Sequence, residues 1–234
     1  MKKMIFAICM AVIIGFTMAV GLCVRELVSP LAVSNFENGM RIVLDAGHGG
    51  MDGGVVGKKT RVKESDLNLS ITYKLKAELE DAGFTVTLTR KTDAGLYDAA
   101  TKGFKRRDMQ KRREIIQSVK PALVISIHQN FYPSQTTRGA QVFYSKNSEG
   151  GRTLAFGMQS KLNTLYAGEN VRARNAASGD FYILECVESP SIIIECGFLS
   201  SEKDERLLCD ESWQKKLAQS ITSGILSYFS DSSA

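Results

Sequence analysis

The chain has 234 residues, 44% of them hydrophobic, which is enough to bury one substantial core in a single domain. Its formal net charge of +5 is modest and its five cysteines are few, so the composition excludes a disulfide framework and gives no reason to expect nucleic-acid binding. Three cysteines lie in the part that we expect to fold: Cys186, Cys196 and Cys209. Cys186 and Cys196 either pair across neighbouring strands or serve as small buried apolar residues.

The N-terminus carries an almost unbroken apolar stretch over residues 4–24, preceded by two lysines. Such a stretch is long enough to cross the hydrocarbon layer of a membrane, so we expect residues 1–24 to be a signal peptide or a membrane anchor, and the length favours the anchor. By the positive-inside rule, the lysines place the rest of the chain outside the membrane. We therefore expect an exported protein, with residues 25–39 as a short linker and residues 40–230 as the folded domain.

Strand and helix patterns alternate after the linker. The apolar run 41–45 predicts a buried strand that leads into a glycine-rich turn at 47–54, where glycines let the backbone approach a ligand closely. From Glu64 onwards, apolar residues recur at helical spacing until Gly83, which predicts a helix that begins at Glu64. Further strands are expected at 84–89, 122–127, 141–144, 181–184 and 192–194, and further helices at 104–119, 154–165 and 213–229. Strands that alternate with helices predict an α/β domain of three layers.

The expected helix at 104–119 is strongly basic. Its cluster consists of Lys105, Arg106, Arg107, Lys111, Arg112 and Arg113. Asp108 and Glu114 interrupt the cluster, and Phe104 is the single aromatic residue beside it that could stack on a base. We therefore expect a solvated helix face close to an anionic wall or membrane, and no nucleic-acid partner.

The two histidines of the chain, His48 and His128, each follow an apolar, β-branched run. Strand ends in one sheet meet at a common crevice, where open α/β sheets bind ligands, and neutral imidazole is the commonest metal ligand. This placement predicts a metal site that holds both imidazoles. The alternative is that each histidine is a hydrogen-bonded core or loop residue.

Two glutamates complete this hypothesis, because two histidines and one carboxylate form a recurrent catalytic zinc arrangement. Glu64 is the best third ligand by position, since it follows the glycine-rich turn and begins a helix, where the helix dipole favours a carboxylate. It can also be an ordinary first-turn glutamate. Glu195 ends the buried run 192–194, where a carboxylate is costly unless the site uses it, and it is the candidate proton acceptor.

Four segments of the chain resemble the sequence motifs of a known protein family: IVLDAGHGGMDGG, KESDLNLS, ISIHQN and IIIECGFLSSEKDERLL. In this order and spacing, from about residue 41 to residue 229, the chain resembles the zinc-dependent N-acetylmuramoyl-L-alanine amidases that trim bacterial peptidoglycan. The resemblance implies that His48, Glu64 and His128 bind zinc. It also implies that Glu195 is the catalytic glutamate, that a mixed sheet of about six strands lies between helices, and that the reaction hydrolyses the amide bond between the lactyl group of N-acetylmuramic acid and L-alanine.

Three positions depart from the usual residues of that family: Gln129 replaces a frequent alanine, Cys196 a frequent threonine and Ser201 a usual asparagine. None is a predicted ligand, so we expect effects on substrate fit and packing. A short, membrane-directed chain with the ECGF version of the last segment is similar to the sporulation members of the family. Their activity implies removal of stem peptides from spore-cortex peptidoglycan as the first step of muramic-δ-lactam formation, at the outer face of the membrane or between the spore membranes. A chain without a targeting module also raises the expectation of an accessory protein that places or activates it.

Four further residues are candidates for supporting roles, each with an alternative. Asp45 either orients His48 through a hydrogen bond or caps the turn. Asn130 either contacts substrate or shapes the loop after its strand. Arg172 and Arg174 either bind a substrate carboxylate as bidentate donors or are solvated surface residues.

Two other functions stay open on the sequence. One is a catalytically weak peptidoglycan-binding or regulatory protein, which intact Glu195 argues against because a binding module has no use for that carboxylate. The other is a zinc peptidase that cuts peptide cross-links. Release of free stem peptide, with glycan and cross-links uncut, separates an amidase from such a peptidase.

Overall fold

The computed structural model describes residues 39–97 and 102–232. The expected signal peptide or anchor at 1–24 and almost all of the linker at 25–39 lie outside the described residues, so both stay predictions. Within the described ranges, no helix is long and apolar enough to span a membrane.

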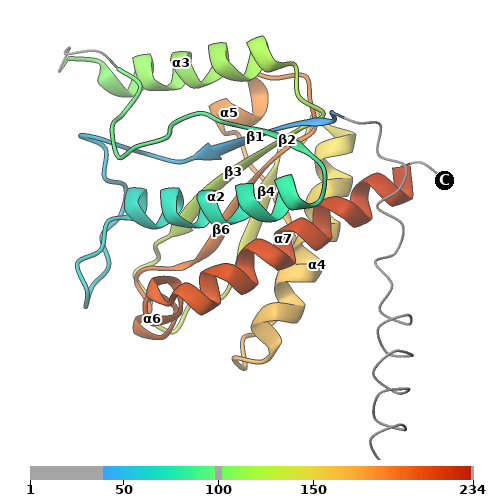
Figure 1. The fold of residues 1–234 in the computed structure, drawn as a ribbon. Helices are drawn as coiled ribbons and strands as arrows, with labels where there is room; N and C mark the ends of the chain where they lie inside the picture. The colour runs from blue at the N-terminus through green and yellow to red at the C-terminus, as the bar shows by residue number, and fades with distance from the viewer. Residues whose placement is uncertain (1–38, 98–101, 233–234) are drawn as a thin grey trace, which may run out of the picture. The chain divides into compact units, whose positions relative to one another are not determined.

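A sheet that has six strands among the described residues forms the centre of the fold (Figure 1). In chain order the strands are β1 (Arg41–Ala46), β2 (Thr85–Leu88), β3 (Leu123–Asn130), β4 (Gln141–Tyr144), β5 (Ala177–Ser178) and β6 (Ser191–Phe198). In space their order is β2-β1-β3-β6-β4-β5. Neighbouring strands are parallel except for β4 and β6, which are antiparallel, so the sheet is mixed, as expected.

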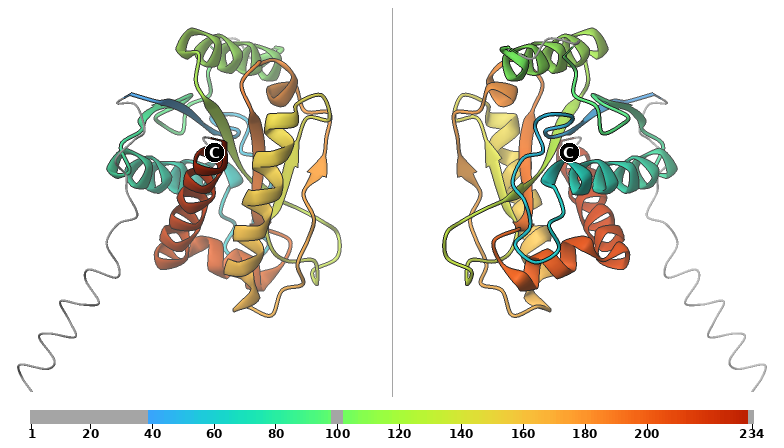
Figure 2. Two further views of the ribbon diagram at one scale, coloured as in Figure 1. Left: turned by 90° about the vertical axis from the view of Figure 1, so that its right-hand side faces the viewer. Right: turned by 90° about the vertical axis from the view of Figure 1, so that its left-hand side faces the viewer.

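Helices cover both faces of the sheet, as Figures 1 and 2 show. They are α2 (Glu64–Asp81), α3 (Phe104–Val119), α4 (Glu149–Ala167), α5 (Tyr182–Glu185), α6 (Glu202–Cys209) and α7 (Glu211–Ser232). Helices α2, α4 and α7 pack together on one face, and α3 with the short α5 lies on the other. Helix α6 contacts β6 and α7. The predicted three-layer α/β sandwich is confirmed.

The central strands are apolar on both sides because helices cover both faces of the sheet. Ile42, Val43 and Leu44 of β1 and Ile192 and Ile194 of β6 are completely buried. Full burial of one such side chain contributes about 1.5–3 kcal/mol. The strands are therefore a firmly packed support for the residues near their carboxyl ends.

Helix α2 begins at Glu64, as predicted. Its buried apolar residues recur at helical spacing and face the sheet and α7: Leu67, Ile71, Leu75 and Leu79. The helix ends at Asp81, and Gly83 then adopts a φ of +93°, a left-handed conformation in which a Cβ would be strained. The packing of this stripe fixes the position of Glu64 at the first turn.

The strand predicted at 181–184 is wrong. Residues Tyr182–Glu185 form helix α5, and the nearby strand is β5, at Ala177–Ser178. A four-residue apolar run fits either structure, so periodicity alone could not decide between them. The sequence also did not predict α6, because this helix is short and five of its eight residues, EKDER, are charged.

Strands β3 and β6 are longer than predicted, and this changes the place of two site residues. The two strands stay paired beyond their apolar runs, up to a register shift between His128 and Asn130. His128 and Glu195 therefore lie inside strands, not just past or at the end of them as expected, and the register pairs them directly. Paired residues on adjacent strands lie on the same face, with backbones about 4.8 Å apart.

Candidate metal centre and catalytic cleft

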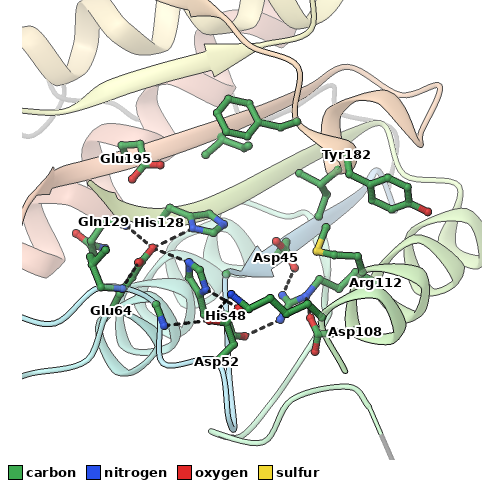
Figure 3. A pocket seen from close by; sticks show the side chains of 18 of the residues that line it. Asp45, His48, Asp52, Glu64, Asp108, Arg112, His128, Gln129, Tyr182 and Glu195 are labelled. Carbon is green, nitrogen blue, oxygen red and sulfur yellow. Dashed lines mark hydrogen bonds and ion pairs between the residues drawn. The ribbon is translucent and has the colours of Figure 1, made fainter. Parts of the chain in front are cut away.

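Three of the predicted site residues meet at one point, where β1 and β3 end and α2 begins (Figure 3). His48 Nε2 lies 3.2 Å from Glu64 Oε1, and His128 Nδ1 lies 3.0 Å from the same oxygen. The two imidazole centroids are 5.0 Å apart. One ligand atom from each residue lies within 4.8 Å of the others, close enough for all three to bind one ion.

Two glycines allow this close approach. A Cβ on Gly47 would lie 2.2 Å from His128 Nε2 and would clash with the imidazole ring. A Cβ on Gly54, which has a φ of +67°, would lie 2.4 Å from Glu64 Oε2 and 2.8 Å from His48 Cδ2. The glycine-rich turn therefore brings backbone against the cluster, as the sequence predicted.

Two buried arginines hold the backbone around His48, whose own φ of +61° is unusual for a residue with a side chain. Arg112 donates from Nη2 to the carbonyl oxygen of His48 at 2.6 Å and from Nη1 to that of Ala46 at 2.8 Å. Arg90 donates from Nη2 to the carbonyl oxygen of Gly47 at 3.1 Å and from Nε to that of Ala46 at 2.8 Å. Three successive carbonyl groups are thus fixed by guanidinium donors.

The burial of Arg112 corrects the prediction of a wholly solvated basic face on α3. Its side chain is only 2% exposed and pairs with the carboxylates of Asp45 and Asp108. Two carboxylates and two carbonyl oxygens satisfy the guanidinium, which makes burial of this charge tolerable. The other cations of the predicted cluster are exposed.

Asp45 does not orient His48 by a direct hydrogen bond, contrary to one of the two roles expected for it. Its carboxylate accepts hydrogen bonds from Thr89 Oγ1 at 2.7 Å and Ser126 Oγ at 2.6 Å, besides its ion pair with Arg112. Burial alone would raise the pKa of Asp45, but Arg112 and the two hydroxyl groups lower it from 3.8 to about 2. Through its ion pair with Arg112, Asp45 supports the guanidinium group that holds the backbone of His48.

The carboxylate that contacts His48 is Asp52, which the sequence reasoning missed. Asp52 Oδ2 lies 3.1 Å from His48 Nδ1. With the ring proton on Nδ1, His48 donates a hydrogen bond to the carboxylate of Asp52. The lone pair of Nε2 then faces Glu64 and His128. Hydrogen bonds of this kind orient metal-binding histidines. The signal was present in the first motif, four residues after His48, but Asp52 lies in a turn outside the predicted strands and helices, so the sequence pattern did not give the direction of its side chain.

A network of hydrogen bonds holds the carboxylate of Glu64 in place. Its Oε1 accepts a hydrogen bond from the backbone N–H of Gln129 at 3.0 Å and from Asn68 Nδ2 at 3.4 Å. Gln129 Nε2 in turn donates to Asn68 Oδ1 at 3.1 Å. Burial raises the pKa of Glu64, but the hydrogen bonds and charges of His128 and His48 outweigh it and hold that pKa well below its usual range. Glu64 is therefore ionised, as a metal ligand must be.

Glu195 lies beside the cluster and is not bonded to it (Figure 3). Its Oε2 atom is buried and has no hydrogen-bond partner among the described residues. Burial, together with the negative charge of Glu64, raises the pKa of Glu195 from 4.5 to about 7, against the opposing effect of the histidines. A carboxyl group that exchanges its proton near neutral pH suits general acid–base work.

The cluster forms the floor of a cleft of about 670 Å³. Apolar side chains also line this cleft and form its apolar wall: Met109 of α3, Phe181, Tyr182, Ile183 and Ile193. Asn130 also lines the cleft, and its Oδ1 accepts a hydrogen bond from the backbone N–H of Phe131 at 2.7 Å, which shapes the loop after β3.

Arg172 and Arg174 are not among the residues that line this cleft. They border a different hollow, beside Arg138. Arg174 donates to the carbonyl oxygen of Arg138 at 3.2 Å and stacks over Phe198 at 5.1 Å, and Arg172 is exposed. The structure gives neither arginine a place near the metal cluster.

The three cysteines of the folded part are free thiols, so Cys186 and Cys196 are not paired. Cys196 is buried, Cys186 is half-buried and Cys209 is exposed.

The donor set fits a divalent transition metal. Two imidazoles and an ionised carboxylate, preorganised by the glycine turn and by Asp52, are the ligand types of catalytic zinc sites, which keep a further position open. Glu195, whose Oε2 atom has no partner in the part of the chain that the structure describes, lines the same cleft. Three such side chains that could hold a metal ion, beside a protonatable carboxylate in an open cleft, are typical of the class of metal-dependent hydrolases.

Sequence comparison gives the family within that class. The profile of the N-acetylmuramoyl-L-alanine amidases matches residues 42–227, and the chain belongs to this family. It is therefore an N-acetylmuramoyl-L-alanine amidase, a hydrolase that acts on peptidoglycan. The predicted family and reaction class are confirmed.

Individual relatives agree with this assignment. The chain is 36% identical over 197 residues to the germination-specific N-acetylmuramoyl-L-alanine amidase of Bacillus subtilis, which covers 83% of this chain and 81% of the relative. It is similar in structure to the CwlD amidase of Clostridioides difficile, solved in complex with the GerS lipoprotein, with a TM-score of 0.78 and 37% identity over 82% of this chain and 98% of that one. The catalytic domain of CwlV from Bacillus (Paenibacillus) polymyxa var. colistinus gives a TM-score of 0.70 and 27% identity over 81% of this chain and 98% of that one.

Proposed function

We propose that this amidase is zinc-dependent and removes stem peptides from spore-cortex peptidoglycan, as the first step of muramic-δ-lactam formation. The bond cut is the amide between the lactyl group of N-acetylmuramic acid and L-alanine. The observation that carries the reaction is the buried Oε2 of Glu195, which has no hydrogen-bond partner among residues 39–97 and 102–232 and lies beside the His48–Glu64–His128 cluster. The cortex as substrate is supported by the likeness to the germination-specific relative over most of both chains.

In this proposal His48, Glu64 and His128 hold the zinc ion. Bound zinc supplies a Lewis acid that makes water nucleophilic near neutral pH and polarises the scissile carbonyl. Glu195 Oε2 accepts the proton of the attacking water and then delivers it to the nitrogen of L-alanine as that nitrogen leaves. Asp52 keeps His48 in the tautomer whose Nε2 faces the cluster.

We further propose that the protein works outside the cytoplasmic membrane, at its outer face or between the spore membranes, and is directed there by residues 1–24. An accessory protein is the second partner that we propose. The structural relative from Clostridioides difficile was solved together with a lipoprotein, which supports this proposal. Co-purification of the full chain from sporulating cells, with intact-mass measurement, tests both the partner and the cleavage of residues 1–24.

The function is tested by mass spectrometry of purified spore cortex and of vegetative sacculi after treatment with the zinc-loaded full chain. We expect free stem peptide from cortex, with glycan and cross-links uncut, and no release with Glu195→Gln. Equal rates on both substrates would contradict the cortex preference. Cut cross-links would identify a peptidase, and tight binding without any release would identify a binding or regulatory protein.

A further inference from the structure

The charged residues of the cleft are unequally available to a ligand. Among the described residues that line it, the carboxylates are Asp45, Asp52, Glu64, Asp108 and Glu195, and the cations besides histidine are Lys105 and Arg112. The guanidinium of Arg112 is 2% exposed and is occupied by two carboxylates and two carbonyl oxygens. Within the described lining, Lys105 is therefore the cation that can reach a bound molecule.

Lys105 stands in the first turn of α3, close to the metal cluster. Its side chain is 68% exposed, and its Nζ lies 3.4 Å from Asp52 Oδ1. The other oxygen of Asp52 lies 3.1 Å from His48 Nδ1, so a single residue separates the ammonium group from a predicted metal ligand. An exposed ion pair of this kind contributes little to stability, and a second carboxylate can share or replace it at small cost.

The substrate of this site carries its carboxylates on one side of the scissile bond. The carboxyl group of the lactyl ether is consumed in the amide, and the N-acetylated sugars are uncharged. The free carboxylates belong to the stem peptide, and the nearest to the scissile bond is the α-carboxylate of the second stem residue, which occurs free or amidated. A cation beside the reacting centre therefore distinguishes the peptide side of the substrate from the glycan side.

We propose that Lys105 binds the α-carboxylate of the second stem residue and makes it a determinant of specificity. This inference rests on the proposed function, because it takes the cluster and Glu195 as the reacting centre. It directs the stem peptide towards the first turn of α3. The competing explanation, the tuning role, is that Lys105 changes only the charge and position of Asp52 and, through Asp52, those of His48. Such a change would affect every substrate alike.

The test uses the zinc-loaded full chain and two soluble muramyl tripeptides that differ only at that α-carboxyl, which is a carboxylate in one and a carboxamide in the other. We expect the wild type to favour the carboxylate by about tenfold in kcat/KM, as for a partly exposed charge-assisted hydrogen bond. Lys105→Met should abolish this preference by lowering kcat/KM for the carboxylate substrate about tenfold and changing the carboxamide substrate less than twofold. Lys105→Arg should keep most of the preference.

The matched control is Lys111→Met. Lys111 is an exposed lysine of the same helix, pairs with Glu114 at 2.9 Å and does not line the cleft, so its loss should leave both substrates unchanged. An equal loss on both substrates in Lys105→Met would overturn the proposal in favour of the tuning role. A preference that survives in Lys105→Met would also overturn it.

A binding measurement separates this inference from the proposed function. Isothermal titration of the two free stem tripeptides, carboxylate and carboxamide, into the wild type and Lys105→Met needs no turnover. We expect about tenfold tighter binding of the carboxylate form by the wild type alone. If the wild type released peptide from neither muramyl substrate, the proposed function would fail, and the dissociation constants would still decide the role of Lys105.

Discussion

Replacement of Asp45 by asparagine removes one buried charge from the lining of the catalytic cleft and keeps the size of the side chain. Asp45 is 1% exposed, and Arg112, Thr89 and Ser126 surround its carboxylate. These contacts lower its pKa from 3.8 to about 2, because they outweigh the cost of burial. A pKa lowered by this amount corresponds to about 2 kcal/mol of stability at pH 7. We therefore expect Asp45→Asn to lower the free energy of unfolding by about 2 kcal/mol or more, since Arg112 would keep only Asp108 as a charged partner.

The pH dependence has a defined sign. A carboxyl group whose pKa is lower in the folded state stabilises the protein fully above its unfolded pKa, and the stabilisation disappears as the pH falls through the folded value. The difference between the wild type and Asp45→Asn should therefore be constant from pH 7 to about pH 5. It should narrow as the pH falls from about 4 towards about 2.

Urea unfolding of the metal-free full chain measures this effect without a contribution from metal binding. The single tryptophan of the chain, Trp213, is 6% exposed and reports unfolding by fluorescence. Asp180→Asn is the control, because its carboxylate is 82% exposed, and it should change stability by less than about 0.5 kcal/mol. A wild-type stability for Asp45→Asn at pH 7, or a difference that does not change between pH 5 and pH 2, would refute the assignment of Asp45 and Arg112 as a stabilising buried pair.

Three further substitutions probe the catalytic cleft directly. Glu195→Gln should lower the rate of stem-peptide release by about 10²–10⁴ while the zinc content, measured by elemental analysis, stays at the wild-type value. Gly47→Ala should weaken metal binding in a chelator competition, because the added Cβ would lie 2.2 Å from Nε2 of His128 and displace the ring. Asp52→Ala should weaken metal binding by about 10–100-fold, because His48 loses the carboxylate that orients it.

Gly157→Ala is the control for the glycine substitution. A Cβ at Gly157 of α4 meets nothing within 4 Å, so metal affinity should not change, and the helix should gain up to about 1 kcal/mol. Wild-type turnover by Glu195→Gln would rule out its role in proton transfer. Metal affinity unchanged in Gly47→Ala or Asp52→Ala would show that the turn does not preorganise the cluster.

Much of the fold could be predicted because the local signals agree with the packing. Helix α3 has the predicted bounds, Phe104–Val119, since Pro121 follows its end and apolar residues recur along one face. The central strands were recognisable because both of their faces are covered, which leaves continuous apolar runs. The prediction of a strand at 181–184 failed because the apolar run is short. Its apolar residues line the cleft and are not part of the sheet.

The three predicted metal ligands could be brought together from the sequence because each lies in a distinctive segment: His48 just after a strand, His128 close to the end of one, and Glu64 at the start of a helix. The residues that support them could not. Asp45 and Arg112 are 67 residues apart, and an arginine in a basic helix has no local sign that it is buried against a carboxylate so distant in the sequence. Asp52 lies in a tight turn closed by a β-bridge to Gly49, and the left-handed backbone at His48 that precedes this turn has no sign in the sequence pattern.

The position of Glu195 in the middle of β6 limits how this enzyme can change. Neighbouring strands hold its backbone on either side, at His128 of β3 and at Gln141 of β4, so it cannot travel with a moving lid. The carboxyl group of Glu195 can move only by rotation about its side-chain torsion angles. The substrate therefore has to bind where the scissile bond reaches this carboxyl group. New substrate preferences in this scaffold can therefore arise in α5 and at the exposed residues of α3 that line the cleft, because these can change while the sheet holds Glu195 and His128 in place.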